Sequence, residues 1–255
     1  MAKVDWLNYK FHASSIGELM TEPRSGPGLS ETCKAHLLAC WIKETYGREK
    51  DVSNKFIEKG LAVEEDAITL YSRNTKTFYR KNQETLSNDF IVGTPDLFDG
   101  PEIRNATTIK DIKSSWSLYT YFSVFVKPIN KDYAWQLSSY CALTGAKSAG
   151  LVYCLVNTPE QLIWKEKDAI KWKMGIIDPS ASEIYMQACE ELEKAMIFDD
   201  IPMEHRHVEF AIDISKYPIE KAYERIKECR KFLSQLKLYP EYKPKLEKEP
   251  LARGT

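Results

Sequence analysis

Acidic residues and lysines gather in two neighbouring segments, IVGTPDLFDG at 91–100 and TTIKDIKSSWS at 107–117. On a β-strand, residues two apart point to the same face about 7 Å apart, so Asp111 and Lys113 share a face. Ile112 then points into the opposite, apolar layer, and its backbone carbonyl stays available as a ligand. A neighbouring strand about 4.8 Å away can set the Asp96 carboxylate beside that of Asp111.

A predicted helix at about 53–73 supplies a third carboxylate. An apolar stripe with helical spacing runs along one face and consists of Ile57, Leu61, Ile68 and Tyr71. Glu64 interrupts this stripe, whereas Glu65 falls on the polar side of the helix. Docking of the stripe on the sheet would bring Glu64 to the same place as Asp96 and Asp111.

Three converging carboxylates require a cation. Two like charges about 4 Å apart repel by roughly 4 kcal/mol at an effective dielectric near 20. Oxygen ligands with room for water and a phosphate favour Mg²⁺, with Mn²⁺ able to substitute, over zinc, which would want Cys or His. Lys113 would either stabilise a pentavalent phosphate or, with a lowered pKa, help to take a proton from the attacking water. The sequence leaves both roles open.

The elements that position these residues alternate between strand and helix patterns. Ser30 and Glu31 open a helix that ends near Gly47. Strands are predicted at 77–80, 90–98, 107–113 and 149–156. Further helices are predicted at 131–143, 180–197 and 217–238, with a mixed stretch at 161–173. This order predicts one α/β layer structure in a single domain at 1–239, followed by a flexible tail at 240–255.

Composition narrows the class of protein. With 43% hydrophobic residues the chain can bury one large core, and its net charge of −1 creates no global positive field, so DNA affinity would need a locally basic cleft. The start lacks a signal-peptide pattern, and the chain lacks a run of roughly 18 apolar residues, which predicts a soluble cytosolic protein without membrane contact. The six cysteines form no CxxC pair and are predicted to be reduced core residues.

Several motifs together carry a resemblance to a nuclease family. Pro95-Asp96 followed by Asp111-Ile112-Lys113 spells the PD-(D/E)xK signature. With GLAVE at 60–64, GTPD at 93–96 and YAWQ at 133–136, the chain resembles the phage lambda-type exonucleases, the YqaJ-like viral recombinases, over about residues 12–156. The resemblance implies that Glu64, Asp96 and Asp111 hold the metal and that Lys113 and Gln136 attend the nucleophile.

Two further residues follow from the resemblance. HASSIG at 12–17 is similar to the serine-containing opening segment of these enzymes, which implies that Ser14 binds a phosphate. PRSG at 23–26 places Arg24 where DNA would be gripped. The chain departs from the family at Asp111, where lambda-type members often have glutamate; the shorter arm would change the metal spacing.

The resemblance predicts a restriction-endonuclease-like α/β core with a central mixed β-sheet flanked by helices. It also implies Mg²⁺-dependent exonuclease activity on linear duplex DNA with free ends, in the 5′ to 3′ direction. A ring-shaped homo-oligomer and a single-strand annealing partner in phage-type recombination are further implications. The alternatives are a DNA endonuclease of the same fold and a catalytically silent module that binds DNA or a protein.

Each motif also has a plainer interpretation. Asp-x-Lys on a strand is usually a surface ion pair, and Glu64 alone could pair with a core arginine. Gln136 could be a helix-surface amide. The aromatic stretch at 115–126 could stack on unpaired bases but is more simply explained by packing. His205 and His207 lack a third ligand and are interpreted as structural or exposed.

Overall fold

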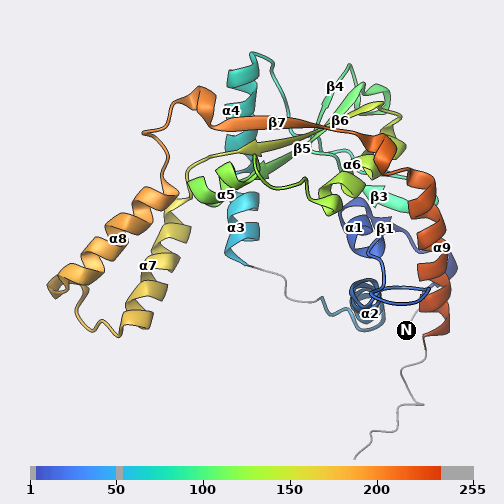
Figure 1. The fold of residues 1–255 in the computed structure, drawn as a ribbon, viewed down its shortest axis with the longest axis horizontal. Helices are drawn as coiled ribbons and strands as arrows, with labels where there is room; N and C mark the ends of the chain where they lie inside the picture. Colours follow the sequence, from blue (N-terminus) through green and yellow to red (C-terminus); the bar gives the residue numbers. More distant parts are fainter. Residues whose placement is uncertain (1–3, 50–53, 237–255) are drawn as a thin grey trace, which may run out of the picture.

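A mixed four-stranded sheet forms the centre of the molecule (Figure 1). The computed structural model describes residues 4–49 and 54–236, so the tail predicted at 240–255 lies outside the described residues. The strands are, in sheet order, β4 (Leu97–Asp99), β5 (Thr108–Ser114), β6 (Ser148–Cys154) and β7 (His207–Ile212). β5 and β6 are parallel, whereas β4 and β7 run antiparallel to their neighbours.

A second, smaller sheet differs from the prediction of one central sheet. It contains β1 (Phe11–His12), β3 (Ile91–Gly93) and β2 (Leu86–Ser87), in that order. The strand predicted at 90–98 is therefore two strands, β3 and β4, which lie in different sheets on either side of Thr94, Pro95 and Asp96. The break matches the rigid φ of Pro95, which also lacks a backbone N–H for a ladder.

The prediction of a strand at 77–80 is wrong. These residues have no regular structure and follow the left-handed Lys76 that ends a helix. Phe78 has a high β-propensity, but its side chain is 79% exposed and does not pack on a sheet.

The predicted helix at 53–73 is two helices. α3 (Lys55–Ala62) ends at Val63, whose φ of −114° and ψ of 13° leave the helical region, and α4 (Glu64–Thr75) follows directly. Ile68 and Tyr71 on α4 are buried as predicted, but Ile57 and Leu61 on α3 are 42% and 72% exposed. The apolar stripe is thus divided between a core helix and a helix at the surface.

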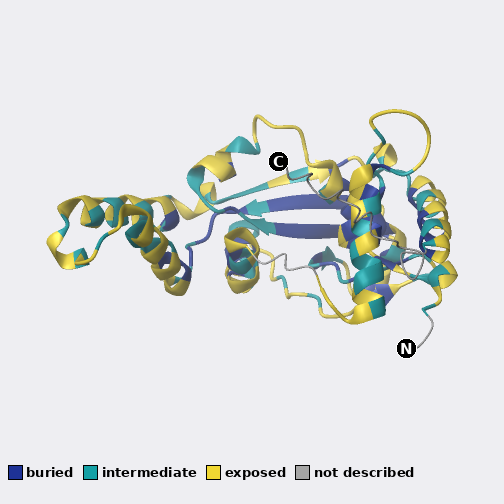
Figure 2. Ribbon diagram, turned by 90° about the horizontal axis from the view of Figure 1, so that it is seen from below, coloured by how far each residue is buried: buried dark blue, intermediate teal, exposed yellow. Residues whose placement is uncertain are grey.

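The remaining helices surround the two sheets. They are α1 (Ile16–Leu19), α2 (Glu31–Tyr46), α5 (Leu118–Ser123), α6 (Lys131–Thr144), α7 (Glu160–Met174), α8 (Glu183–Met196) and α9 (Ile219–Gln235). The stretch predicted as mixed at 161–173 is helix α7. α7 and α8 form a hairpin that projects from the sheet and is largely exposed (Figure 2).

Helices cover opposite faces of the central sheet. α6 packs on one face, where Leu137 meets Ile109 of β5 and Leu151 of β6. α4 packs on the other face, where Ala67 joins Ile112 of β5 in a second buried cluster. β5 and β6 therefore lie between two helical layers.

The cysteines and the apolar content of the helices were also subjects of sequence-based predictions. All six cysteines are free thiols as predicted; four of them are buried, whereas Cys40 and Cys189 are partly exposed and are not core residues. No helix among the described residues is long and apolar enough to span a membrane.

Candidate active site

The predicted alternation of β5 is confirmed. Asp111 is 1% exposed and belongs to the face that α6 covers, together with Lys113. Ile112 is buried in the apolar cluster on the opposite face, against α4. Asp111 and Lys113 therefore lie on one face of β5 and Ile112 on the other, as strand geometry requires.

Asp96 lies beside Asp111 because it directly precedes β4, whose first residue, Leu97, pairs with Lys110 of β5. Asp96 Oδ2 accepts a hydrogen bond from the Ile112 N–H at 2.9 Å. Asn82 fixes the turn, since its backbone N–H donates to the Asp96 carbonyl at 2.9 Å and its amide donates to the Pro95 carbonyl at 2.9 Å. The residues on both sides of this carboxylate are thus held in place.

The two carboxylates affect each other strongly. Burial, and second the neighbouring charge of Asp111, raise the pKa of Asp96 to about 7. Lys113 and the Ile112 N–H oppose this rise without cancelling it. The metal-free pair is therefore an unfavourable concentration of negative charge in a dry place.

Lys113 supplies the one cation that contacts Asp111 among the described residues. Its Nζ lies 2.8 Å from Asp111 Oδ2 and 4.8 Å from the centre of the Tyr133 ring. Burial alone would lower the pKa of Lys113, but the carboxylates of Asp111 and Asp96 outweigh burial and raise its pKa above the ordinary value. Of the two roles left open by the sequence, this geometry favours the charged ammonium over the neutral base.

Asp111 is incompletely satisfied. Both of its carboxylate oxygens are buried, and Lys113 is the group that approaches them in the described part of the chain, at 2.8 Å from Oδ2. Of the described residues, Lys113 alone offsets the cost of an ionised carboxylate buried here, and its charge is shared with Asp96. Because Asp96, Asp111 and a backbone carbonyl offer only oxygen atoms, this donor set suits a hard divalent ion.

Glu64 does not complete a three-carboxylate cluster. It is the first residue of α4, which packs on the sheet face opposite to Asp111, so it reaches the pocket only at the end of the sheet. Its Oε2 pairs with Lys81 Nζ at 2.6 Å. Among residues 4–49 and 54–236, no three His, Cys, Asp or Glu side chains are grouped closely enough to hold a metal ion. Glu64 thus shares the pocket with Asp96, and its charge adds to the rise in the pKa of Asp96, but these side chains and Asp111 are not gathered into one ligand group in this arrangement.

Gln136 is buried rather than a surface amide. Its Nε2 donates to the Tyr140 hydroxyl at 3.0 Å, one turn along α6. Burial raises the pKa of Tyr140, and the nearby charges of Asp111 and Asp96 raise it further. Tyr140, which the sequence analysis did not select, is thus the side chain through which Gln136 approaches the carboxylates.

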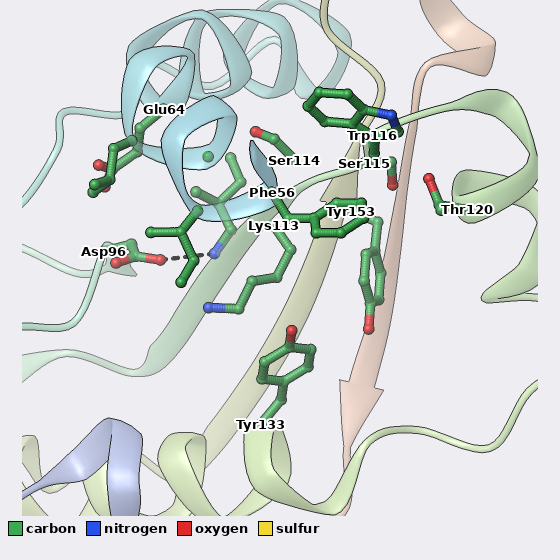
Figure 3. A pocket seen from close by; sticks show the side chains of 14 residues that line it. Phe56, Glu64, Asp96, Lys113, Ser114, Ser115, Trp116, Thr120, Tyr133 and Tyr153 are labelled. Atoms are coloured by element: carbon green, nitrogen blue, oxygen red, sulfur yellow. Dashed lines mark hydrogen bonds between the residues drawn. The ribbon is translucent and has the colours of Figure 1, made fainter. Parts of the chain in front are cut away.

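Asp96 and Lys113 line a pocket of about 510 Å³. It lies at the carboxyl ends of β5 and β6, with Glu64 and Asp96 on one side and Trp116 and Thr120 on the other (Figure 3). Tyr153 also lines it, because it is the register partner of Lys113 on β6. Sequence reasoning missed Tyr153, although its two-residue spacing from buried Leu151 on an apolar strand was a usable signal.

Part of the pocket wall is apolar. Phe56, Ile57 and Leu61 from α3 line it together with Trp116, and the rings of Phe56 and Trp116 meet edge-on at 5.4 Å. Within the aromatic stretch at 115–126, Tyr121 is buried. Packing therefore explains one member of the stretch, whereas Trp116 belongs to the pocket.

Ser14 and Arg24 lie elsewhere. Ser14 lines a separate pocket of about 320 Å³ beside His12 and His36. Arg24 is exposed in the bend between α1 and α2. Their phosphate contacts remain predictions, and the structure does not bring either residue into the pocket of Asp96 and Lys113.

The histidines at 205 and 207 have structural surroundings. His207 begins β7, its Nδ1 lies 2.7 Å from the Asn74 amide nitrogen, and its ring meets Tyr71 edge-on. His205 lies in a short 3-10 helix just before the strand. His207 is thus structural and His205 is exposed, as the sequence suggested.

Solved structures of exonucleases share this fold. A phage-related exonuclease from Haemophilus somnus 129PT superposes with a TM-score of 0.68 at 23% identity, over 89% of this chain and 95% of that chain. The alkaline exonuclease LHK-Exo from Laribacter hongkongensis superposes with a TM-score of 0.58 at 14% identity, over 90% and 91%. LHK-Exo in complex with dAMP gives a TM-score of 0.56 at 15% identity, over 90% and 89%.

Sequence comparison adds nothing to this likeness. No protein-family profile matches the chain, and no curated protein sequence matches it. The resemblance to phage exonucleases is thus confirmed at the level of the fold, over nearly the whole length of both chains.

Proposed function

We propose that this chain is a Mg²⁺-dependent exonuclease that hydrolyses phosphodiester bonds of linear duplex DNA. The observation that carries the proposal is that Asp96 and Lys113 line one pocket at the end of β5, with the buried Asp111 in contact with Lys113 beneath it. This pocket lies in a fold that the chain shares with exonucleases. Paired acids with one lysine fit phosphodiester hydrolysis, because they can hold a hard cation and neutralise charge on the transferred phosphate.

The residues that would hold the ion are Asp96, Asp111 and the backbone carbonyl of Ile112. A strand residue directs its N–H and C=O to the same side, so the Ile112 carbonyl faces the edge where its N–H meets Asp96. Glu64 would join this set after releasing Lys81. When bound, Mg²⁺, or Mn²⁺ in its place, acts as a Lewis acid and lowers the pKa of bound water.

The chain itself supplies charge, orientation and enclosure. The Lys113 ammonium would stabilise the negative charge that develops on the phosphate. Gln136, held by Tyr140, would orient the attacking water. A pocket of about 510 Å³ is in the size range of small-molecule sites and has room for a nucleotide, the class of molecule that LHK-Exo binds as dAMP.

The direction and partners of the reaction also belong to the proposal. By resemblance, degradation runs 5′ to 3′ in phage-type recombination, with Ser14 and Arg24 contacting DNA phosphates. A ring-shaped homo-oligomer and a single-strand annealing protein are the proposed partners. The net charge of −1 restricts DNA contacts to local groups of this kind.

Digestion of a linear, 5′-phosphorylated duplex with and without Mg²⁺ tests the activity. Lys113→Ala and Asp111→Ala should each lower the rate by about 10²- to 10⁴-fold at fixed low salt. Lys147→Ala is the matched control, because Lys147 is exposed and precedes β6 at the end opposite to the pocket. Equal rates for wild type, Lys113→Ala and Asp111→Ala would refute the enzyme and leave the silent binding module.

A closed circular plasmid separates exonuclease from endonuclease. An enzyme that requires ends leaves the circle intact while it digests the same plasmid after linearisation. Nicked or linear products from the circle would replace the exonuclease with an endonuclease of the same fold.

A further inference from the structure

Lys59 is a buried cation that the proposed chemistry does not use. It lies on α3 and is 1% exposed, among the most deeply buried large side chains of the described chain. No carboxylate among the described residues pairs with its Nζ. Burial lowers the pKa of Lys59 to about 7, which shows how poorly this place tolerates a charge. A lysine in such a place needs a reason beyond packing.

The ammonium of Lys59 holds the backbone that leaves the catalytic strand. Nζ donates to the Ser115 carbonyl at 2.7 Å and lies 3.4 Å from the Trp116 carbonyl. The rings of Trp116 and Phe198 face the same Nζ at 5.8 and 5.1 Å. Carbonyl oxygens and ring faces together replace the missing carboxylate.

The segment after Lys113 is fixed at three successive points. The Ser115 N–H donates to the Cys154 carbonyl on β6 at 2.8 Å, and the Ser115 carbonyl accepts from Lys59. Ser117 then caps α5 through a reciprocal pair of bonds with Thr120. Lys59 is the member of this set that comes from α3, across the pocket.

The two elements joined by Lys59 are two walls of the proposed active site. α3 contributes Phe56 and Leu61 to the pocket, and the exit of β5 contributes Lys113 and Trp116. Lys59 does not line the pocket itself; its bond to Ser115 joins α3 to the segment that carries Trp116, whose ring meets Phe56 edge-on. The distance between the walls therefore depends on the bond from Lys59 to Ser115.

We infer that Lys59 is a positioning residue, whose Nζ, as a hydrogen-bond donor to the Ser115 carbonyl, sets the separation of the pocket walls and thereby the place of Lys113. It contacts no reacting group and acts through Ser115 and Trp116. The inference rests on the proposed nuclease function and adds a residue to it. An apolar side chain of equal length would fill the space but leave the Ser115 carbonyl without this donor.

Lys59→Met in the full-length chain tests the role, because methionine keeps most of the volume and removes the ammonium. We expect kcat on linear duplex to fall about 10- to 100-fold and KM to stay within about threefold, the effect of displaced walls. The melting temperature should not fall, because the substitution removes a buried charge. A folded variant whose kcat stays within twofold of wild type overturns the inference.

Lys55→Met is the matched control. Lys55 lies one turn earlier on α3, with its Nζ 4.9 Å from the Trp116 ring, but it is exposed and paired with Glu166. Its kcat should stay within twofold of wild type. An equal loss in both variants would trace the effect to the charge near Trp116 and overturn the role of the buried bond.

A measurement on the wild type covers the case in which Lys59→Met does not fold. In protein labelled with ¹⁵N at lysine Nζ and held at pH 6, below the pKa of about 7 of Lys59, one ammonium signal should be protected from exchange and should shift when a deoxynucleoside monophosphate is added. Absence of a protected signal, or a protected signal that ignores the nucleotide, overturns the inference. Because this readout needs no turnover, inactive wild-type protein would refute the proposed nuclease without deciding the role of Lys59.

Discussion

Replacement of Asp96 by asparagine should stabilise the metal-free protein while removing its activity. The folded chain raises the pKa of Asp96 from 3.8 to about 7 through burial and the charge of Asp111. At about 1.4 kcal/mol for each tenfold change in the acid equilibrium, ionised Asp96 costs the fold about 4 kcal/mol. Asparagine carries no charge and keeps an oxygen that can accept the Ile112 N–H.

The pH dependence identifies the cause. Between pH 3.8 and about 7, the folded chain holds a proton on Asp96 that the unfolded chain has released. The stability of the wild type relative to Asp96→Asn therefore falls as pH rises through this window. The advantage of the variant should be small at pH 4 and should reach its full value of about 4 kcal/mol by pH 8.

Urea unfolding in EDTA at pH 4, 6 and 8 measures this advantage. Asp200→Asn serves as a control, because Asp200 is exposed and does not line the pocket. Added Mg²⁺ should then stabilise the wild type, which binds it only when folded, and should stabilise Asp96→Asn much less. An advantage that is equal at pH 4 and pH 8, or a variant less stable than wild type at pH 8, would show that the carboxylate is not strained.

Three further substitutions test neighbouring parts of the site. Gly93→Ala should destabilise the protein by about 1–3 kcal/mol in urea unfolding, since a Cβ there would lie 2.7 Å from Tyr140 Cε1; an unchanged midpoint would mean that the ring yields. Lys81→Met should lower the Mg²⁺ concentration for half-maximal rate by up to about fivefold, because an exposed pair such as Lys81–Glu64 contributes about 0–1 kcal/mol; a higher Mg²⁺ requirement would contradict this competition. The stability of wild type relative to Lys59→Met should rise by about 1.4 kcal/mol per pH unit from pH 7 to 9. The reason is that the unfolded chain keeps the lysine proton up to about pH 10.5, whereas the folded chain loses it at about pH 7. A stability difference that does not change with pH would show that Lys59 has an ordinary pKa.

Helix ends were predictable because their causes are local. The Ser30 side chain accepts from the Cys33 N–H at 3.0 Å, and Gly47 ends the same helix with a φ of 62°. Both devices act within one turn of chain and require no partner from elsewhere. The same holds for the faces of β5, which covalent geometry alone separates.

The break between α3 and α4 was not predictable in this way. Val63 is neither glycine nor proline, and the apolar spacing continues across it from Leu61 to Ile68. The two halves of the stripe face different surroundings, because Ile68 is buried under the sheet whereas Leu61 lines the pocket. A tertiary preference thus overrides a continuous local pattern.

The positions of Asp96 and Asp111 were predictable from the sequence, whereas the partner of Glu64 was not. Asp96 and Asp111 meet because adjacent strands bring them together, which the sequence indicated. The partner of Glu64 is Lys81, which follows α4 in a segment without regular structure. Side-chain choice between a metal and a lysine depends on the loop conformation, and spacing in a sequence does not contain that information.

Buried polar atoms without a hydrogen bond concentrate beside the pocket in the described part of the chain, and this distribution supports a functional interpretation of Asp111. Other buried cations are paired or hydrogen-bonded. Lys110, on the face of β5 opposite to Asp111, pairs with Glu209 at 2.8 Å and Asp99 at 3.4 Å. Arg230 donates to the backbone carbonyls of Tyr9 and Asp89. Apart from the Thr158 hydroxyl, the buried side-chain polar atoms without a hydrogen bond in the described chain are the two oxygens of Asp111. Lys110 lies on the same strand as Asp111 and receives carboxylates from β4 and β7, so the deficit at the pocket is not a general weakness of the core. A deficit confined to the place where a cation and a phosphate would bind is what preorganisation for those ligands requires.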